Sequence, residues 1–257
     1  MLSLFSALVL GVVEGFTEFL PISSTAHLNL AADLLRLAQT DYMKTFEIAI
    51  QSGAILAVLV LYGKRFLRRD VLTRVAVAFL PTGILGLVLY KLVKTYLIGN
   101  TLVVLWALAA GGVLLILFEK FHSEKDAVAS IGEISYAHSF VIGVFQSVAM
   151  IPGVSRAAAT IVGGMLLGLR RELIAEFSFL LAVPTMFAAT GLDLAQNIHA
   201  FSAGEMDLLL VGFVASFVTA VAGIKFLLAY IRAHSFTGFG VYRIVLVAAF
   251  LAMMVFA

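Results

Sequence analysis

The chain is a series of long apolar stretches separated by short polar connections. Six of these stretches are long and apolar enough to cross a bilayer as helices, which takes about 20 residues each. With soft boundaries they are residues 46–62, 75–96, 101–118, 174–192, 208–231 and 238–256. The pattern predicts an all-α integral membrane protein.

Two further apolar stretches are interrupted near their middles. Segment 2–36 is broken at Pro21–Ser24, and segment 132–168 is broken at Pro152–Ser155. Each half of such a segment is too short to span comfortably. An apolar helix, a break rich in Pro, Gly and Ser, and a second apolar helix together indicate a re-entrant hairpin.

The two broken segments resemble each other. Gly143 and Gln146 follow Gly11 and Glu14 by 132 positions, whereas from the prolines onward the offset is 131. One gap therefore aligns two halves, approximately 1–125 and 126–257, within a single membrane domain, 1–257. Each half would hold one hairpin and three spans.

An odd number of spans in each half means that the second half inserts upside down relative to the first. This is the inverted-topology repeat of many transporters, whose sites lie where the halves meet. The repeat could also be only a scaffold left by duplication. Facing broken helices must have their backbone groups satisfied, which favours a wet cavity with a use.

Composition supports the membrane assignment, because 62% of the 257 residues are hydrophobic and only 12% are charged. A net charge of +2 gives no reason to expect nucleic acid, and the absence of cysteine excludes disulfides and thiolate chemistry. Basic residues concentrate in alternate connections, which predicts that 63–74, 119–131, 169–173 and 232–237 are cytoplasmic. Arg36 and Lys44 lie on the predicted outer side.

Glu14 and Glu18 lie four residues apart on the first arm of the first hairpin, so they share a helix face. Carboxylates in a bilayer are costly unless they are paired or hydrated. The first 35 residues contain no Lys or Arg. The pair is therefore a candidate ligand set for a hard divalent cation. The alternatives are an exposed amphipathic face or two protonated acids.

Hydroxyl groups and a histidine follow at the first break. Ser23 and Ser24 would ordinarily be read as helix N-caps. His27 lies one helical turn after Ser24, and a histidine near a serine is the minimum set for an activated nucleophile. The neighbouring Glu14 and Glu18 strengthen this second interpretation.

The second break carries Arg156, the only Lys or Arg between Lys125 and Arg170. Arginine binds phosphate bidentately, and helix N-termini attract anions. Gly153, Ser155, Arg156 and Thr160 therefore look like a phosphate cradle, with Ser23 and Gln146 as further candidates. Alternatively, Arg156 only neutralises a glutamate of the first hairpin.

Four motifs resemble the undecaprenyl-diphosphate phosphatases, also called bacitracin-resistance proteins. The resemblance follows the whole chain in order, and agreement of all four motifs by chance is implausible. The motifs are Glu14-x₃-Glu18 with Leu20–Leu28, Pro152-Gly153-x-Ser155-Arg156-x₃-Thr160 preceded by Gln146, Phe46–Ala57 and Phe177–Pro184.

This resemblance implies a phosphatase of the bacterial inner membrane. It would convert undecaprenyl diphosphate to the monophosphate carrier lipid for cell-wall synthesis, with a divalent cation (Mg²⁺ or Ca²⁺) and an active site open to the outer side. Glu14 and Glu18 would hold the metal or position water. Ser24 would be the nucleophile, His27 the acid or base, and Arg156 the phosphate clamp. Whether the protein forms a homodimer is left open.

Two departures from the family pattern stand out: Ala26 where glycine is usual, and Ala157-Ala158 where Ser-Gly is usual. Neither removes a charged group, so we expect activity to survive. A lipid-phosphate transporter is the rival function, although transport does not need His27 beside Ser24. Lipid phosphatases that use two histidines are disfavoured because Ala157–Thr160, without histidine, follow Arg156.

Overall fold

The computed structural model describes residues 2–38, 40–97, 99–122, 128, 130–197 and 206–256. These residues form helices, and their only bridge of strand type joins Val128 to Leu169. A π-helical turn spans Val93–Leu97 and a 3₁₀ turn spans Ile131–Glu133. The α-helices are α1 (Leu4–Glu18), α2 (Ser24–Leu34), α3 (Asp41–Phe66), α4 (Arg69–Leu92), α5 (Thr101–Phe121), α6 (Tyr136–Val148), α7 (Arg156–Leu166), α8 (Arg171–Asn197), α9 (Met206–Ile231) and α10 (Thr237–Phe256).

Six helices of the described chain, α3, α4, α5, α8, α9 and α10, are long and apolar enough to cross a membrane. They coincide with the six predicted stretches, so the prediction of an all-α, multi-pass membrane protein is confirmed. Several helices run beyond the apolar pattern. Helix α3, for example, continues past Lys64 and Arg65 to Phe66, because long basic side chains can extend from a helix end toward the polar interface.

The two interrupted stretches are each a pair of short helices. Residues 19–23 join α1 to α2, and residues 149–155 join α6 to α7. Ser23 and Ser155 cap the second helix of each pair, accepting hydrogen bonds from the backbone N–H groups of Ala26 and Ala158. Both serines adopt positive φ, 69° and 74°. This conformation costs a residue with a Cβ atom on the order of 1 kcal/mol, so packing around the turns must hold it in place.

The caps of the second helices are spaced differently from the prolines of the two turns. The N-caps Ser23 and Ser155 are 132 positions apart, and so are the C-caps Leu35 and Leu167. The C-caps of the first helices, Phe19 and Ala149, are instead 130 positions apart, so the two turns differ in length by two residues. The alignment of the two halves, with its gap at the prolines, stays a prediction.

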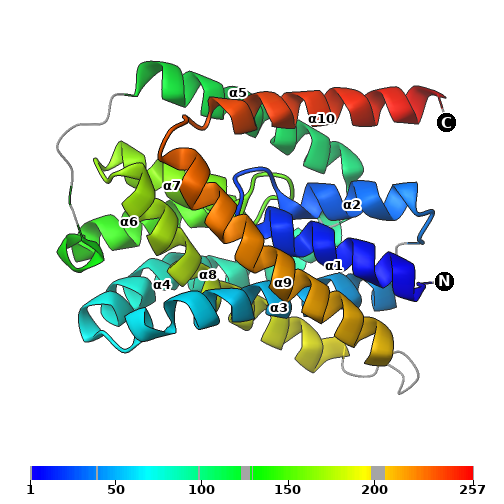
Figure 1. Cartoon of the computed structure of the whole chain (residues 1–257), viewed down its shortest axis with the longest axis horizontal. Helices are drawn as coiled ribbons and strands as arrows, with labels where there is room; N and C mark the ends of the chain where they lie inside the picture. The colour runs from blue at the N-terminus through cyan, green and yellow to red at the C-terminus, as the bar shows by residue number, and fades with distance from the viewer. Residues whose placement is uncertain are drawn as a thin grey trace.

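The two turns meet near the centre of the molecule. In Figure 1 the pair α1–α2 lies in the right half and the pair α6–α7 in the left half. The start of α1 and the end of α10 lie at the same end. This arrangement agrees with hairpins that enter from opposite ends, whereas inversion of the halves across a bilayer stays a prediction. The predicted boundary at 125 and 126 lies outside the described residues.

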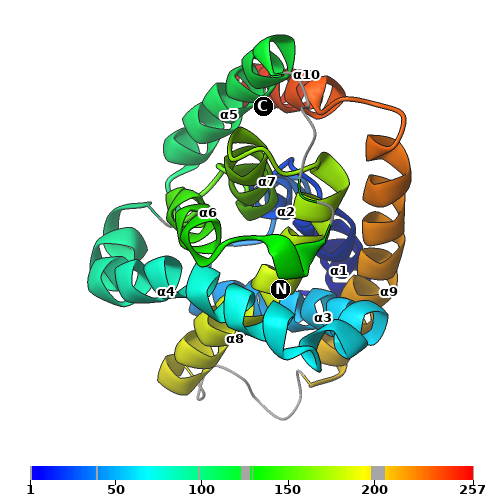
Figure 2. The same cartoon turned by 90° about the vertical axis from the view of Figure 1, so that its left-hand side faces the viewer.

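Glycines allow the first helix of each pair to lie close against a long helix. A Cβ atom on Gly11 or Gly15 of α1 would collide with backbone carbonyl oxygens of α9, and one on Gly143 of α6 would collide with the carbonyl oxygen of Ala78 on α4. Small residues are the usual means of close helix packing in membranes. Figure 2 shows α9 and α4 at the periphery, outside α1 and α6.

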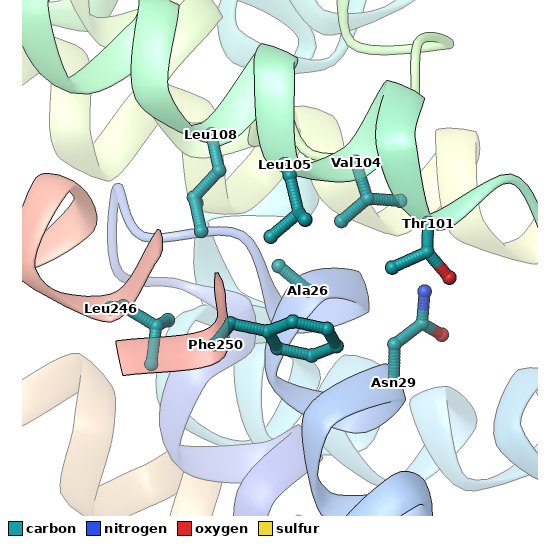
Figure 3. A pocket seen from close by; sticks show the side chains of 8 residues that line it. All are labelled: Ala26, Asn29, Thr101, Val104, Leu105, Leu108, Leu246 and Phe250. Carbon is teal, nitrogen blue, oxygen red and sulfur yellow. The ribbon is translucent and has the colours of Figure 1, made fainter. Parts of the chain in front are cut away.

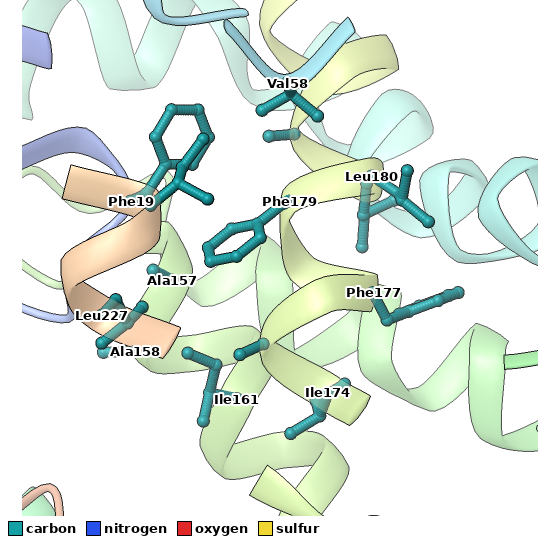
Figure 4. Packing of buried hydrophobic residues seen from close by; sticks show 14 of the residues in the cluster. Phe19, Val58, Ala157, Ala158, Ile161, Ile174, Phe177, Phe179, Leu180 and Leu227 are labelled. Atoms are coloured by element: carbon teal, nitrogen blue, oxygen red, sulfur yellow. The ribbon is translucent and has the colours of Figure 1, made fainter. Parts of the chain in front are cut away.

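An apolar core packs against the two turns. Phe19, from the first turn, packs edge-on against Phe179 of α8, with ring centroids 5.5 Å apart. Ala157 and Ile161 of α7 and Ile174 of α8 belong to the same cluster (Figure 4). Helices α5 and α10 pack side by side along one edge of the molecule (Figure 2). The polar residues at the turns thus lie against a packed apolar cluster.

Candidate active site

Two side chains beside the turns meet at the carboxylate of a third. Glu18 ends α1, Ser24 begins α2 and Arg156 begins α7. The Ser24 hydroxyl donates to Glu18 Oε2 at 2.5 Å, and Arg156 Nη2 donates to Glu18 Oε1 at 3.1 Å. The side chains of Arg156 and Glu18 are only 11% and 9% exposed. The ion pair is therefore shielded from solvent, where charged hydrogen bonds are strong.

The Arg156 guanidinium is fixed on three sides. Its Nη1 donates to the backbone carbonyl of Ser178 on α8 at 2.9 Å. Its Cζ lies 5.7 Å from the centroid of the Phe19 ring, which gives a cation–π contact. The structure therefore presents a rigid cation at the meeting point of the two turns, which suits recognition of a phosphate group.

Backbone contacts hold the two turns against each other and against α5. The Ser155 hydroxyl donates to the carbonyl of Leu20 at 3.4 Å. Gly153 has a φ of +97°, and a Cβ atom there would lie 2.5 Å from the carbonyl oxygen of Val104 on α5. Only glycine fits this position without strain. Ser23, Gly153 and Ser155 thus shape the turns that carry Ser24 and Arg156.

Glu14 lies fully buried one helical turn before Glu18. Neither of its carboxylate oxygens has a hydrogen-bond partner. The charged groups that act on it are Glu18, Glu47 of α3 and Arg156. Glu14 and Glu18 therefore repel each other when both are charged, and a bound cation or a proton would relieve this repulsion.

Glu14 and Glu18 have the right chemistry to be two ligands of a divalent cation. The unpartnered buried oxygens of Glu14 support this fit. Within the described residues, however, no three His, Asp or Glu side chains gather as a complete metal site. Water and substrate oxygens would have to supply the remaining ligands, as is usual for Mg²⁺.

His27 lies close to Ser24 in sequence, but its ring nitrogens contact other groups. Its Nδ1 lies 2.7 Å from the carbonyl oxygen of Ser23, and its Nε2 lies 2.7 Å from the hydroxyl of Tyr242 on α10. The group that contacts the Ser24 hydroxyl is instead Glu18. The predicted Ser24–His27 pairing is therefore not the arrangement in this structure.

Two of the predicted phosphate ligands are engaged in packing between helices. Gln146 donates from Nε2 to the hydroxyls of Thr82 and Thr185, on α4 and α8. The Thr160 hydroxyl lies 2.6 Å from that of Ser178 and donates to the Arg156 carbonyl. Gln146 therefore lies in a polar cluster of its own, and Thr160 secures α7 to α8.

Comparison with known proteins decides the family. Residues 7–249 match the family described as bacitracin resistance protein BacA. The chain belongs to the BacA family. It is 54% identical to a protein of Sulfurihydrogenibium sp., over 93% of this chain and 95% of the relative. Identity is 50% to a protein of Aquifex aeolicus, over 97% and 98% of the two chains, and 47% to one of Thermus thermophilus, over 96% of each. All three relatives are named undecaprenyl-diphosphatase.

The BacA match includes a buried residue that the sequence analysis did not single out. Arg243 of α10 is completely buried. It donates to the carbonyls of Pro21, Gly153 and Val154 in the two turns, and to those of Ala107 and Leu108 in α5, at 2.8–3.4 Å. A lone charge inside the apolar stretch 238–256 was the available signal, since such residues are seldom without a role.

A narrow apolar cavity lies beside α2 in this BacA-family chain. Ala26 and Asn29 face it from α2, while Leu246 and Phe250 continue the face of α10 that carries Tyr242 (Figure 3). The wall from α5 is formed by Thr101, Val104, Leu105 and Leu108. Helices α2, α5 and α10 thus enclose an apolar space next to His27.

Proposed function

We propose that this chain is a membrane phosphatase that hydrolyses undecaprenyl diphosphate to undecaprenyl phosphate and inorganic phosphate. The observation that carries the proposal is the meeting of Ser24 and Arg156 on the Glu18 carboxylate. A nucleophile and a phosphate-binding cation thereby contact the same base. The shared name of the relatives identifies the reaction class and the lipid substrate. Nothing in that comparison favours the transporter.

Substrate binding follows from the charge of Arg156. The terminal phosphate would replace Glu18 on the guanidinium, with the N-terminal N–H groups of α7 facing the same anion. The positive charge then stabilises the negative charge that develops on the phosphoryl oxygens during transfer. The prenyl chain stays in an apolar environment.

In the bond-making step Ser24 is the nucleophile and Glu18 is the base. Ser24 Oγ attacks the terminal phosphorus while its proton passes to Glu18. The bond from that phosphorus to the bridging oxygen breaks, and its electron pair leaves with undecaprenyl phosphate. Water then hydrolyses the phosphoserine. In the alternative course, water activated by Glu18 attacks directly and Ser24 only binds phosphate.

A divalent cation, Mg²⁺ or Ca²⁺, is part of the proposal, with Glu14 and Glu18 as its protein ligands. It would supply positive charge against the diphosphate and against the repulsion between these two carboxylates. The unpartnered oxygens of Glu14 support this assignment.

The proposed setting is the bacterial inner membrane, with the site open to the outer side. There the enzyme would return the carrier lipid to cell-wall synthesis, as its resemblance implies. The distribution of basic residues supports this orientation. All proposed site residues come from one copy of the chain, so the reaction does not require a dimer.

The test is phosphate release from a prenyl diphosphate by purified protein in detergent, where transport has no meaning. We expect release by the wild type that EDTA stops, and losses of about 10²-fold or more in Glu18→Gln and Arg156→Ala. Arg36→Ala, which changes an arginine outside the site, is the matched control. No release by folded wild type over a range of cations would overturn the proposal. Ser24→Ala with full activity would exclude only the phosphoserine course.

A further inference from the structure

The contacts of His27 fix which ring nitrogen carries the proton when the ring is neutral. A backbone carbonyl only accepts hydrogen bonds, so the contact from Nδ1 to the Ser23 carbonyl at 2.7 Å requires a proton on Nδ1. In a neutral imidazole the other nitrogen, Nε2, then carries a lone pair. The Tyr242 hydroxyl, 2.7 Å from Nε2, donates to that lone pair. The geometry therefore selects one tautomer of His27.

Tyr242 contacts His27 through its ring as well as through its hydroxyl group. The rings of Tyr242 and His27 are parallel within 3°, with centroids 5.6 Å apart. The ring of His27 is nearly buried, whereas Tyr242 is 43% exposed. Leu246 and Phe250, one and two turns further along α10, face α2 across the apolar cavity (Figure 3). The contact thus belongs to a face of α10 directed at α2.

His27 in turn acts on the backbone beside the proposed nucleophile. Ser23 carries the strained positive φ of the first turn and caps α2. Its carbonyl also accepts from the backbone N–H of His27, at 3.3 Å. A second donor from the His27 side chain fixes the Ser23 peptide, and Ser24 follows directly. A chain of contacts therefore leads from α10 through His27 to the nucleophile.

We propose that Tyr242 is a positioning residue of the phosphatase, acting through His27. By donating to Nε2 it keeps His27 as the Nδ1–H tautomer, which holds the Ser23 carbonyl and thereby places Ser24 against Glu18. Arg243, the next residue of α10, is the charged group that acts on His27. This inference rests on the proposed function. Helix α10, remote in sequence from both turns, thus takes part in catalysis.

The kinetic test removes only the hydroxyl. We expect Tyr242→Phe to lower kcat for phosphate release about tenfold or more while KM changes less than about twofold, since substrate-binding groups remain. Tyr230→Phe is the matched control, because Tyr230 stacks on His234 outside the site, with ring centroids 4.6 Å apart. Activity of Tyr242→Phe within twofold of the wild type would overturn the inference.

A spectroscopic test does not depend on activity. Wild type and His27→Gln are both labelled with ¹⁵N-histidine. The signals that disappear in the variant are those of His27 among the five histidines. We expect a protonated Nδ1 and an unprotonated Nε2, and we expect the Nε2 signal to move in Tyr242→Phe but not in Tyr230→Phe. A protonated Nε2 with a bare Nδ1 in the wild type would overturn the inference even if Tyr242→Phe did not fold. Absence of phosphate release by the wild type would instead overturn the proposed function and leave this measurement valid.

Discussion

At the scale of single residues, buried charges and donors decide the geometry of the site. Glu18 accepts from Ser24 and from Arg156, and Arg243 donates to carbonyls in both turns. Glu18 is thus partnered by side chains at the starts of α2 and α7, and Arg243 by backbone carbonyls of the two turns and of α5. Removing one partner leaves the others buried and unsatisfied, which costs more than the bond itself contributes.

Arg243→Met should destabilise the protein strongly. It would take this donor away from the three turn carbonyls, those of Pro21, Gly153 and Val154, at about 1–3 kcal/mol for each buried group that finds no substitute. Thermal unfolding in detergent measures the loss. Arg232→Met, at a side chain that is 70% exposed, is the control. Equal melting temperatures for the two variants would contradict the clamping role of Arg243.

At the scale of helices, the two broken pairs depend on close backbone contact with their neighbours. Helix α1 lies on α9 and α6 lies on α4, at equivalent glycines of the two halves. Lipid offers little hydrophobic drive for helix association, so such contact supplies the packing energy. The turns are positioned because the arms that carry them cannot shift on these neighbours.

Two glycine substitutions, one where α6 contacts α4 and one on an open face of α4, should change the free energy of unfolding in opposite directions. A Cβ atom in Gly143→Ala would collide with the Ala78 carbonyl and lie 3.0 Å from Pro81 Cδ, so we expect a loss of about 1–3 kcal/mol. In Gly86→Ala, on α4, the new Cβ atom has no neighbour within 4 Å, so we expect a gain of about 0.5–1 kcal/mol from helix propensity. Thermal unfolding of both variants measures these changes. A stabilised Gly143→Ala would refute the close contact of α6 with α4.

At the scale of the whole molecule, the sequence was sufficient to predict the helices and part of the site. Apolar length predicts the six spans, and Pro, Gly and Ser mark the two turns, which bring Glu18, Ser24 and Arg156 together. Side-chain direction was not predictable, because it depends on neighbours distant in sequence. Gln146 therefore joins Thr82 and Thr185, and His27 turns to Tyr242.

The orientation in the membrane is testable because the chain has no cysteine. Ala38, between α2 and α3, is predicted to lie outside, and Leu67, between α3 and α4, inside; both are exposed. We expect a maleimide that cannot cross membranes to label Ala38→Cys in intact cells, and Leu67→Cys only after the cells are opened. The reverse pattern would place the site on the cytoplasmic side.

Because Glu18 binds Arg156 in the resting site, it competes with phosphate for the same guanidinium. In the proposed reaction, the Glu18 carboxylate stays on the guanidinium until a phosphate displaces it, so this exchange would lower the affinity of the site for any phosphate. Uniformly tight binding would not speed turnover. The same carboxylate returns as inorganic phosphate leaves, which favours release of a product that shares the charge of the substrate. The pairing thus lowers the affinity for phosphate and favours turnover.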